Sequence, residues 1–212
     1  MRICAMTWPF PFGVRLGWAT AGAPNPDPCR ALGRVYLLRG QGMAFSPGFG
    51  RMCARLRRAG LWAEDVRCVG DAWVRRHLRS DQAAGRLHGP VILVGHSCGA
   101  RYALYTAQQL APLGITVDLI VCVDVAWAYD VPDNVTHAVH FYRSRWRLHP
   151  ARPLLPAPGS TARIINVDLD APGSRIAPVG LHHLNITGCP ALQDWIVRYV
   201  LENTATKCRP TR

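Results

Sequence analysis

Lysine is almost absent from this chain of 212 residues, because only Lys207 among its 25 basic residues is a lysine. The basic residues outnumber 13 acidic ones, and the formal net charge is +12. A strongly basic chain can bind nucleic acid, but these arginines are spread from end to end in small clusters. We therefore interpret them as a compositional bias carried on solvated helix faces and expect no specific nucleic-acid partner. The charge still favours anionic substrates through long-range steering.

Long apolar runs are also missing. None approaches the roughly 20 residues of a membrane-spanning helix, so we expect no transmembrane segment. The apolar stretch at residues 1–23 is broken by Pro9, Pro11 and Arg15, whereas a signal peptide needs an uninterrupted apolar centre. We interpret it as a leading segment and favour a cytoplasmic location, with export left open.

No C-x-x-C pair occurs among the eight cysteines, which argues against a zinc or redox site. Cys122 falls within a predicted buried strand and is expected to be a small core residue. Four others, at positions 4, 29, 189 and 208, remain available for disulfide pairing if the protein is exported.

Hydrophobic residues make up 49% of the chain and charged residues 18%, which is typical of a globular protein. The length fits one domain. We expect a loosely packed N-terminal segment at residues 1–33, a folded domain at 34–203 and a C-terminal tail at 204–212.

Strand-like and helical patterns alternate along the chain. Strands are predicted at residues 34–38, 65–69, 91–94, 117–125, 135–142 and 163–167. Helices are predicted at residues 49–56 (ended by Gly60), 72–87, 100–110 and 191–201. This alternation predicts an α/β three-layer sandwich, with a mostly parallel sheet of about six strands, helices on both faces and little or no cap.

The most informative stretch is Gly95-His-Ser-Cys-Gly99, which matches the pattern G-x-S-x-G. A buried strand precedes it and a helix follows, and this is the context in which the pattern marks a nucleophilic serine. We expect Ser97 on a strained turn, with both glycines required because a Cβ there would collide with a neighbouring strand or helix. The alternative is a serine that only caps the helix.

The order of these features resembles the α/β-hydrolase superfamily, and most closely its small lipase- and thioesterase-like members. The resemblance covers about residues 34–201 and rests on the strand, the Gly95-His-Ser-Cys-Gly99 turn, the helix, a later strand ending in an acid, and a histidine before the last helix. It implies a serine nucleophile, a histidine base and an acid that orients the histidine. It also implies catalysis without a metal or an organic cofactor.

His182 and His183 lie where the superfamily keeps its histidine. We prefer His183 as the base, because His-Leu-Asn-Ile resembles the stretch that leads into the last helix. His96 lies inside the motif, and we expect its side chain to point away from the substrate and to pack.

The acid is expected at Asp124, near the end of the apolar strand at residues 117–125, a place that resembles the one where some lipases carry it. The superfamily commonly places it one strand later, but that strand ends Phe141-Tyr-Arg-Ser144 without a carboxylate. A carboxylate at the tip of a buried strand needs a partner, and a histidine N–H supplies one. Asp130 is the reserve, and Asp168 and Asp170 fit less well.

The oxyanion hole is expected to combine the backbone N–H of Cys98 with one from the loop at residues 40–43. Gln41 is the preferred second donor, with Met43 as an alternative. The proline-rich stretch at residues 152–158 is expected to form one wall of the site.

These inferences together predict a serine hydrolase that cleaves an ester or thioester of a small-molecule or lipid-like acyl substrate through an acyl-enzyme. The acyl group, its natural acceptor and the oligomeric state stay open. The alternative is a non-catalytic binding module of the same fold, which is favoured if Asp124 and His183 do not meet at Ser97.

Overall fold

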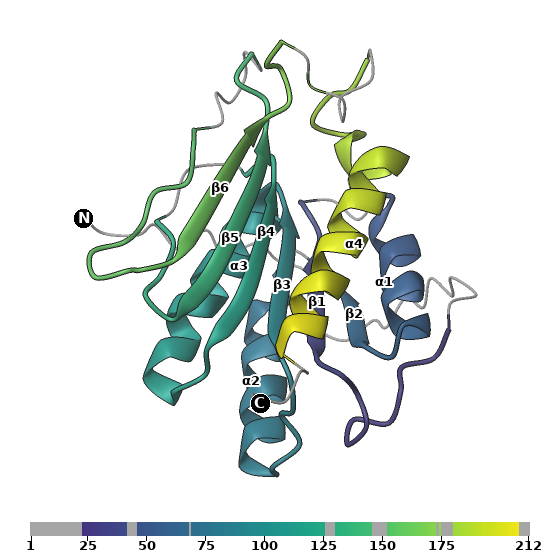
Figure 1. Ribbon diagram of the computed structural model, residues 1–212, viewed down its shortest axis with the longest axis vertical. Helices are drawn as coiled ribbons and strands as arrows, with labels where there is room; N and C mark the ends of the chain where they lie inside the picture. The colour runs from purple at the N-terminus through teal and green to yellow at the C-terminus, as the bar shows by residue number, and fades with distance from the viewer. Residues whose placement is uncertain are drawn as a thin grey trace, which may run out of the picture.

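The computed structural model describes residues 23–41, 46–67, 69–125, 130–145, 152–172, 174 and 180–207, in which strands and helices alternate (Figure 1). The strands are β1 (Arg34–Leu38), β2 (Trp62–Val66), β3 (Val91–His96), β4 (Val117–Val123), β5 (Val135–Tyr142) and β6 (Arg163–Asp168). The helices are α1 (Phe49–Arg58), α2 (Asp71–Ala83), α3 (Cys98–Leu110) and α4 (Pro190–Lys207), with short 3₁₀ turns η2 (Ala111–Leu113) and η3 (Ile186–Gly188).

The six strands form one parallel sheet in the order β2-β1-β3-β4-β5-β6. The chain enters at β1, adds β2 on one side, and then crosses back to β3 and continues outward to β6. Strands β1 and β3 are therefore neighbours whose following segments leave in opposite directions. In a parallel sheet this reversal opens a crevice at the carboxyl ends of the two strands, where ligands bind.

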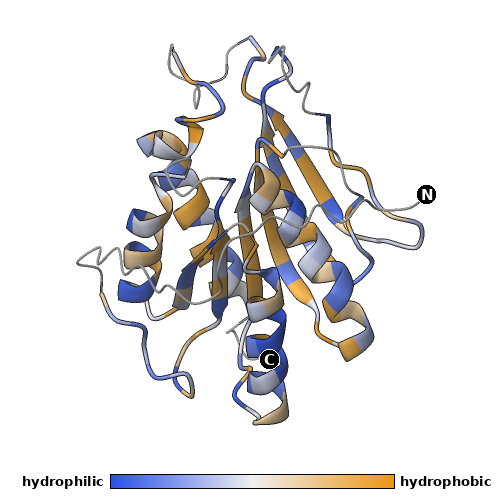
Figure 2. Cartoon of the chain, turned by 180° about the vertical axis from the view of Figure 1, so that it is seen from behind, coloured by the Kyte–Doolittle hydropathy of each residue, from blue (hydrophilic) through white to orange (hydrophobic). Residues whose placement is uncertain are grey.

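Helices cover both faces of the sheet. Helices α1 and α4 lie over one face, and α2 and α3 lie over the other (Figure 1). Alternate residues of β1 serve the two layers: Val35 and Leu37 pack toward α1 and α4, while Tyr36 and Leu38 pack toward α2 and α3. Because both faces are covered, the central strands β3 and β4 are mostly apolar, as Figure 2 shows.

The second strand begins three residues earlier than its apolar pattern suggests, at Trp62 instead of residue 65. It pairs with β1 from Arg34↔Trp62 to Leu38↔Val66. The predicted strand began after the charged residue Glu64, which obscured the start of this edge strand. In the fold, Arg57 lies 3.2 Å from Glu64, and Arg39 Nε donates to Asp65 Oδ1 at 2.6 Å.

Helix α2 is shorter than its pattern suggests, ending at Ala83 instead of near residue 87. Gly85 has a φ of +65°, in the left-handed region that favours glycine, and this ends the helix. Helix α4 in contrast continues to Lys207, past the expected boundary at residue 203. At the other end of the domain, Asn25 Oδ1 accepts a hydrogen bond from the Ala63 N–H at 2.8 Å.

The segment that contains Leu154 and Pro156 packs beside α3, on the face of the sheet that α2 and α3 cover. The side-chain amide of Asn166 in β6 accepts a hydrogen bond from the Leu154 N–H at 2.8 Å and donates one to the Leu154 carbonyl at 3.1 Å. Pro156 forms an isolated bridge with Val131. Leu154 is buried in the core as a result. The described parts of the connections after β4 and β5 contain no helix.

A buried ion pair ties the start of β1 to α2. Arg34 is fully buried, and its Nε donates to Asp81 Oδ2 at 2.8 Å. Its Nη2 donates to the carbonyls of Pro28 and Arg86 at 2.9 and 2.8 Å. Burial raises the pKa of Asp81, but hydrogen bonds and charges from Arg34 and its neighbours outweigh this, and the pKa lies below its usual value. The planar, forked guanidinium suits such a many-partnered site better than an ammonium.

A second buried polar group lies in β5. His140 is fully buried, and its Nε2 accepts a long hydrogen bond, at 3.4 Å, from the backbone N–H of Val125. Burial lowers the pKa of His140 to about 4, against a smaller opposing effect from the Asp124 charge. The imidazole is therefore neutral at physiological pH.

Replacing Asp81 should destabilise the fold strongly. The substitution Asp81→Asn leaves the buried Arg34 charge without its counter-charge, so we expect the free energy of unfolding to fall by about 3 kcal/mol or more. Urea unfolding followed by circular dichroism measures this. In the control, Asp194→Asn removes an exposed pair with Arg55 and should cost less than about 1 kcal/mol. Equal losses in the two variants would contradict the assignment.

Acid should weaken the fold through His140. Below pH 6.5 the unfolded chain binds a proton at this position, whereas the folded protein does so only near pH 4. The contribution of His140 to the free energy of unfolding therefore declines as the pH falls from 6.5 to 4, by about 2 kcal/mol between pH 7 and pH 5. Urea unfolding at these two pH values should show a smaller decline for His140→Phe than for the wild type. The exposed control His88→Asn should behave like the wild type, and identical declines in all three proteins would rule out this role.

Candidate active site

Ser97 occupies the sharp turn between β3 and α3. Its backbone has φ 56° and ψ −125°, a region that residues with a Cβ rarely adopt. The turn is held because the Ser97 N–H donates to the Val123 carbonyl at 2.9 Å. The residue is 9% exposed, so its hydroxyl lies at the edge of the protein interior.

The two glycines of the motif are needed for close packing, as the sequence predicts. A Cβ on Gly95 would lie 2.3 Å from the Cα of Ala100 in α3. A Cβ on Gly99 would lie 2.1 Å from the Leu38 carbonyl oxygen, at the end of β1. Both distances are impossible for a real side chain, so this turn can form only with glycine at each position.

His183 and Asp124 meet at Ser97. His183 Nε2 lies 2.8 Å from Ser97 Oγ, and His183 Nδ1 lies 2.7 Å from Asp124 Oδ2. An ionised carboxylate can only accept hydrogen bonds, so Nδ1 carries the proton and donates a hydrogen bond to Asp124. The unprotonated Nε2 then accepts a hydrogen bond from the Ser97 hydroxyl. The side chain of Asp124 is 4% exposed and that of His183 is 20% exposed, which leaves one side of the imidazole open to solvent.

Asp124 follows the last residue of β4 in a strained turn of its own. Its φ is 48°, and its backbone N–H donates to the Phe141 carbonyl at 2.7 Å. The turn aims the carboxylate across the ends of the strands toward His183.

The alternative residues take other positions. His182 is exposed and its backbone N–H bonds to the side chain of Asn185. Asp130 is also exposed. Asp170 is engaged with Arg143, whose Nε and Nη2 donate to Oδ1 at 2.8 and 2.6 Å. Asp168 Oδ1 accepts from nearby backbone N–H groups.

The loop after β1 lies directly against the serine. A Cβ built on Gly40 would lie 3.3 Å from the Cβ of Ser97. Gln41 follows Gly40 in this loop, and Cys98 begins α3 immediately after Ser97. Cys98 therefore adjoins the serine in the chain, and Gln41 adjoins a residue that lies beside it. Their role as oxyanion donors stays a prediction. Met43 lies outside the described residues.

His96 does more than pack, which corrects the sequence interpretation. It is fully buried, its Nδ1 lies 3.0 Å from Ser46 Oγ, and its Nε2 lies 3.0 Å from the His183 carbonyl oxygen. A polar ring at the end of a buried strand needs hydrogen-bond partners, so the sequence indicated that the His96 ring has polar contacts. Nothing in the local pattern identified the partners, which lie 50 and 87 positions away.

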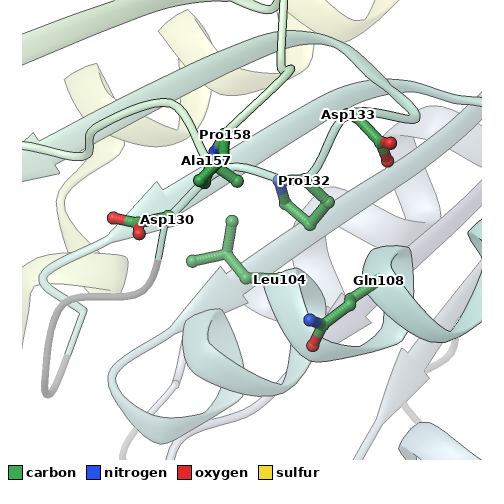
Figure 3. Close-up of a pocket in the computed structure, with 7 residues that line it drawn as sticks. All are labelled: Leu104, Gln108, Asp130, Pro132, Asp133, Ala157 and Pro158. Carbon is green, nitrogen blue, oxygen red and sulfur yellow. The ribbon is translucent and has the colours of Figure 1, made fainter.

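A separate hollow of about 390 Å³ lies beside α3, between Leu104 and Gln108 and the segments around Pro132 and Pro158 (Figure 3). Ser97, His183 and Asp124 are not among the residues that line it. The proline-rich stretch contributes Ala157 and Pro158 to this hollow. Its expected role as a wall of the Ser97 site stays a prediction.

Two other features are absent from the described part of the chain. No group of three or more His, Cys, Asp or Glu side chains there is arranged to hold a metal ion. Nor does any helix in those residues have the length and apolarity that crossing a membrane requires.

No family model matches the sequence, and no curated protein matches it. Solved structures do match. Human thioesterase 2 is 11% identical, with a TM-score of 0.52 over 86% of this chain and 100% of that one. The RedJ thioesterase from the prodiginine biosynthetic pathway in Streptomyces coelicolor is 13% identical, with a TM-score of 0.50 over 95% and 100%.

Est1E from Butyrivibrio proteoclasticus is a third similar structure, with 11% identity and a TM-score of 0.50 over 87% of this chain and 93% of that one. At these identities the likeness concerns the fold. The strand order, the parallel sheet and the helices on both faces agree with it. The chain therefore has the α/β-hydrolase fold that its sequence pattern predicts.

Proposed function

We propose that the protein is a serine hydrolase that cleaves an ester or thioester through an acyl-enzyme. The observation that carries this proposal is the unbroken hydrogen-bonded chain Ser97–His183–Asp124 at the carboxyl edge of the sheet. A serine hydroxyl is a weak nucleophile until a base removes its proton. Here a neutral imidazole nitrogen lies 2.8 Å from the hydroxyl oxygen, which is the distance that proton transfer requires.

In the first step Ser97 Oγ attacks the acyl carbonyl carbon while its proton passes to His183 Nε2. Asp124 accepts the Nδ1–H bond, fixes the tautomer and stabilises the positive charge that forms on the ring. The carbonyl oxygen, now negative, is held by the backbone N–H groups of Cys98 and Gln41. His183 then donates this proton to the departing alcohol or thiol, and the acyl group stays on Ser97.

In the second step water takes the place of the departed group. His183 removes a proton from the water, the resulting oxygen attacks the acyl carbon, and the proton returns to Ser97 as the acid is released. An alcohol or thiol acceptor in place of water would give acyl transfer by the same route. The thioesterase names of two similar structures support a thioester as one of the two bonds to test.

The position of the site supports catalysis over a purely binding role. A non-catalytic module of this fold has no need to bring a histidine and a buried carboxylate to the serine, and these three groups do converge. The serine also follows β3 at the point where the strand order reverses. Ligands of parallel sheets bind at such a point.

Labelling with a fluorophosphonate probe tests the nucleophile. The wild type should react rapidly, because Ser97 attacks the phosphorus and displaces fluoride. Ser97→Ala should lose at least about 99% of the labelling, given the hundredfold or larger contribution of a positioned base and nucleophile. Labelling is read by in-gel fluorescence on protein shown by circular dichroism to be folded. The matched control is Ser80→Ala, an exposed position on α2, which should label like the wild type. A folded wild type that does not label would overturn the proposal.

Hydrolysis of p-nitrophenyl esters and acyl thioesters of increasing chain length tests the acid. Asp124→Asn should lower kcat by about ten-thousandfold with a much smaller change in KM, because the amide favours the wrong histidine tautomer. Asp130→Asn, which changes an exposed carboxylate at the hollow beside α3, should keep the wild-type rate. Loss of activity in Asp130→Asn with retention in Asp124→Asn would reverse the assignment.

A further inference from the structure

The residue before the proposed nucleophile has two polar contacts that the reaction itself does not use. His96 ends β3 and is fully buried. Its Nε2 lies 3.0 Å from the backbone carbonyl oxygen of His183, and its Nδ1 lies 3.0 Å from Ser46 Oγ. The two imidazole rings are neighbours, with centroids 4.9 Å apart and planes tilted by 39°.

The direction of each hydrogen bond follows from the atoms involved. A carbonyl oxygen only accepts hydrogen bonds, so His96 Nε2 carries a proton and donates a hydrogen bond to the His183 carbonyl. Ser46 Oγ accepts from the Gly40 N–H at 3.1 Å, and in a neutral His96 the unprotonated Nδ1 accepts a hydrogen bond from the Ser46 hydroxyl. In this arrangement His96 is neutral. One tautomer and one hydroxyl rotamer satisfy all three bonds.

The result is a relay of hydrogen bonds between the two loops that border Ser97. It runs from the Gly40 N–H to the Ser46 hydroxyl, from that hydroxyl to His96 Nδ1, and from His96 Nε2 to the His183 carbonyl. Gly40 precedes the proposed oxyanion donor Gln41, and His183 is the proposed base. The relay therefore connects the backbone of the oxyanion loop with the backbone of the base loop.

We propose that His96 and Ser46 are positioning residues that hold the His183 loop and the Gly40–Gln41 loop in register with Ser97. This inference rests on the proposed function. Neither residue touches the reacting atoms: both ring nitrogens of His96 are directed to Ser46 and to the His183 carbonyl, so His96 is not the base. Their effect is on geometry, since a shift of about 1 Å at a reacting group can cost about a hundredfold in rate.

The buried state of these atoms explains why a hydrocarbon side chain cannot replace His96. A phenylalanine would fill the space but leave the Ser46 hydroxyl and the His183 carbonyl without their partner. Buried polar groups left unpaired are unfavourable, and the loops would shift to find other partners or water. A neutral imidazole also places no charge beside the positive charge that forms on His183 during the reaction.

Two amide variants separate the two bonds of His96. The amide of asparagine reaches the position of Nδ1, so His96→Asn can keep the Ser46 bond but loses the His183 bond. The longer glutamine brings its Nε2 amide to the position of the imidazole Nε2, so His96→Gln can keep the bond to His183. Ser46→Ala breaks the relay from the other side and leaves the histidine in place.

The kinetic test uses a p-nitrophenyl ester and the thermal unfolding midpoint of each variant. We expect His96→Asn to lower kcat about tenfold to a hundredfold, with KM within about threefold of the wild-type value. We expect His96→Gln to keep most of the wild-type kcat. Ser46→Ala should lower kcat in the same sense by a smaller factor. The control His88→Asn, an exposed histidine before β3, should match the wild type. If His96→Gln and His96→Asn lose activity equally, or only in proportion to their thermal unfolding midpoints, the positioning role is overturned.

A second readout separates this inference from the proposed function. The proton shared by His183 Nδ1 and Asp124 should give a strongly downfield resonance in the proton NMR spectrum, identified by its loss in Asp124→Asn. We expect it to persist in His96→Gln and to shift or broaden in His96→Asn and Ser46→Ala. This holds even if the wild type neither labels nor turns over esters, in which case the hydrolase proposal fails and the NMR decides the positioning role. An unchanged resonance in all variants overturns that role.

Discussion

The close approach of the end of β1 to the first turn of α3 is the constraint on which the candidate site depends. Strands β1 and β3 pair in parallel up to Leu38↔Gly95, and the Leu38 carbonyl oxygen lies 2.1 Å from where a Cβ of Gly99 would be. No side chain separates the loop after β1 from the turn at Ser97. This close approach is what the proposed oxyanion hole requires, with backbone N–H groups of both segments directed to one substrate atom. Any larger residue at position 99 would push the loop away and remove this convergence.

The proposed nucleophile and the proposed acid are held by the same backbone arrangement on neighbouring strands. Ser97 and Asp124 each follow the last residue of a strand, and each has a positive φ. Each also donates its backbone N–H to the next strand, Ser97 to Val123 and Asp124 to Phe141. Such backbone strain costs on the order of 1–3 kcal/mol per residue and persists where the surroundings fix it. Here the backbone hydrogen bond to the next strand fixes each strained residue. Both side chains lie beyond the carboxyl ends of the strands.

The sequence predicted what depends on local pattern, and missed what depends on distant partners. Ser97 could be proposed because glycines and an apolar strand surround it. Asp124 could be proposed because its place resembles that of the acid in some lipases and because a carboxylate at a buried strand end needs a partner. The start of β2 was misplaced because Glu64 resembles a loop residue until Arg57 is placed beside it. The role of His96 was missed for the same reason, since its partners belong to loops far away in the chain.

His183 is the one member of the proposed catalytic chain that the sheet does not hold. Its loop is fastened locally by Asn185, whose side chain accepts from the His182 N–H at 2.7 Å and donates to the Gly180 carbonyl at 3.1 Å. These bonds fix the shape of the loop but not its distance from Ser97. The hydrogen bond from His96 to the His183 carbonyl fixes that distance, because His96 is the last residue of the strand that precedes Ser97. A base on a loop can thus be as well placed as a nucleophile on a strand when one buried side chain connects the two.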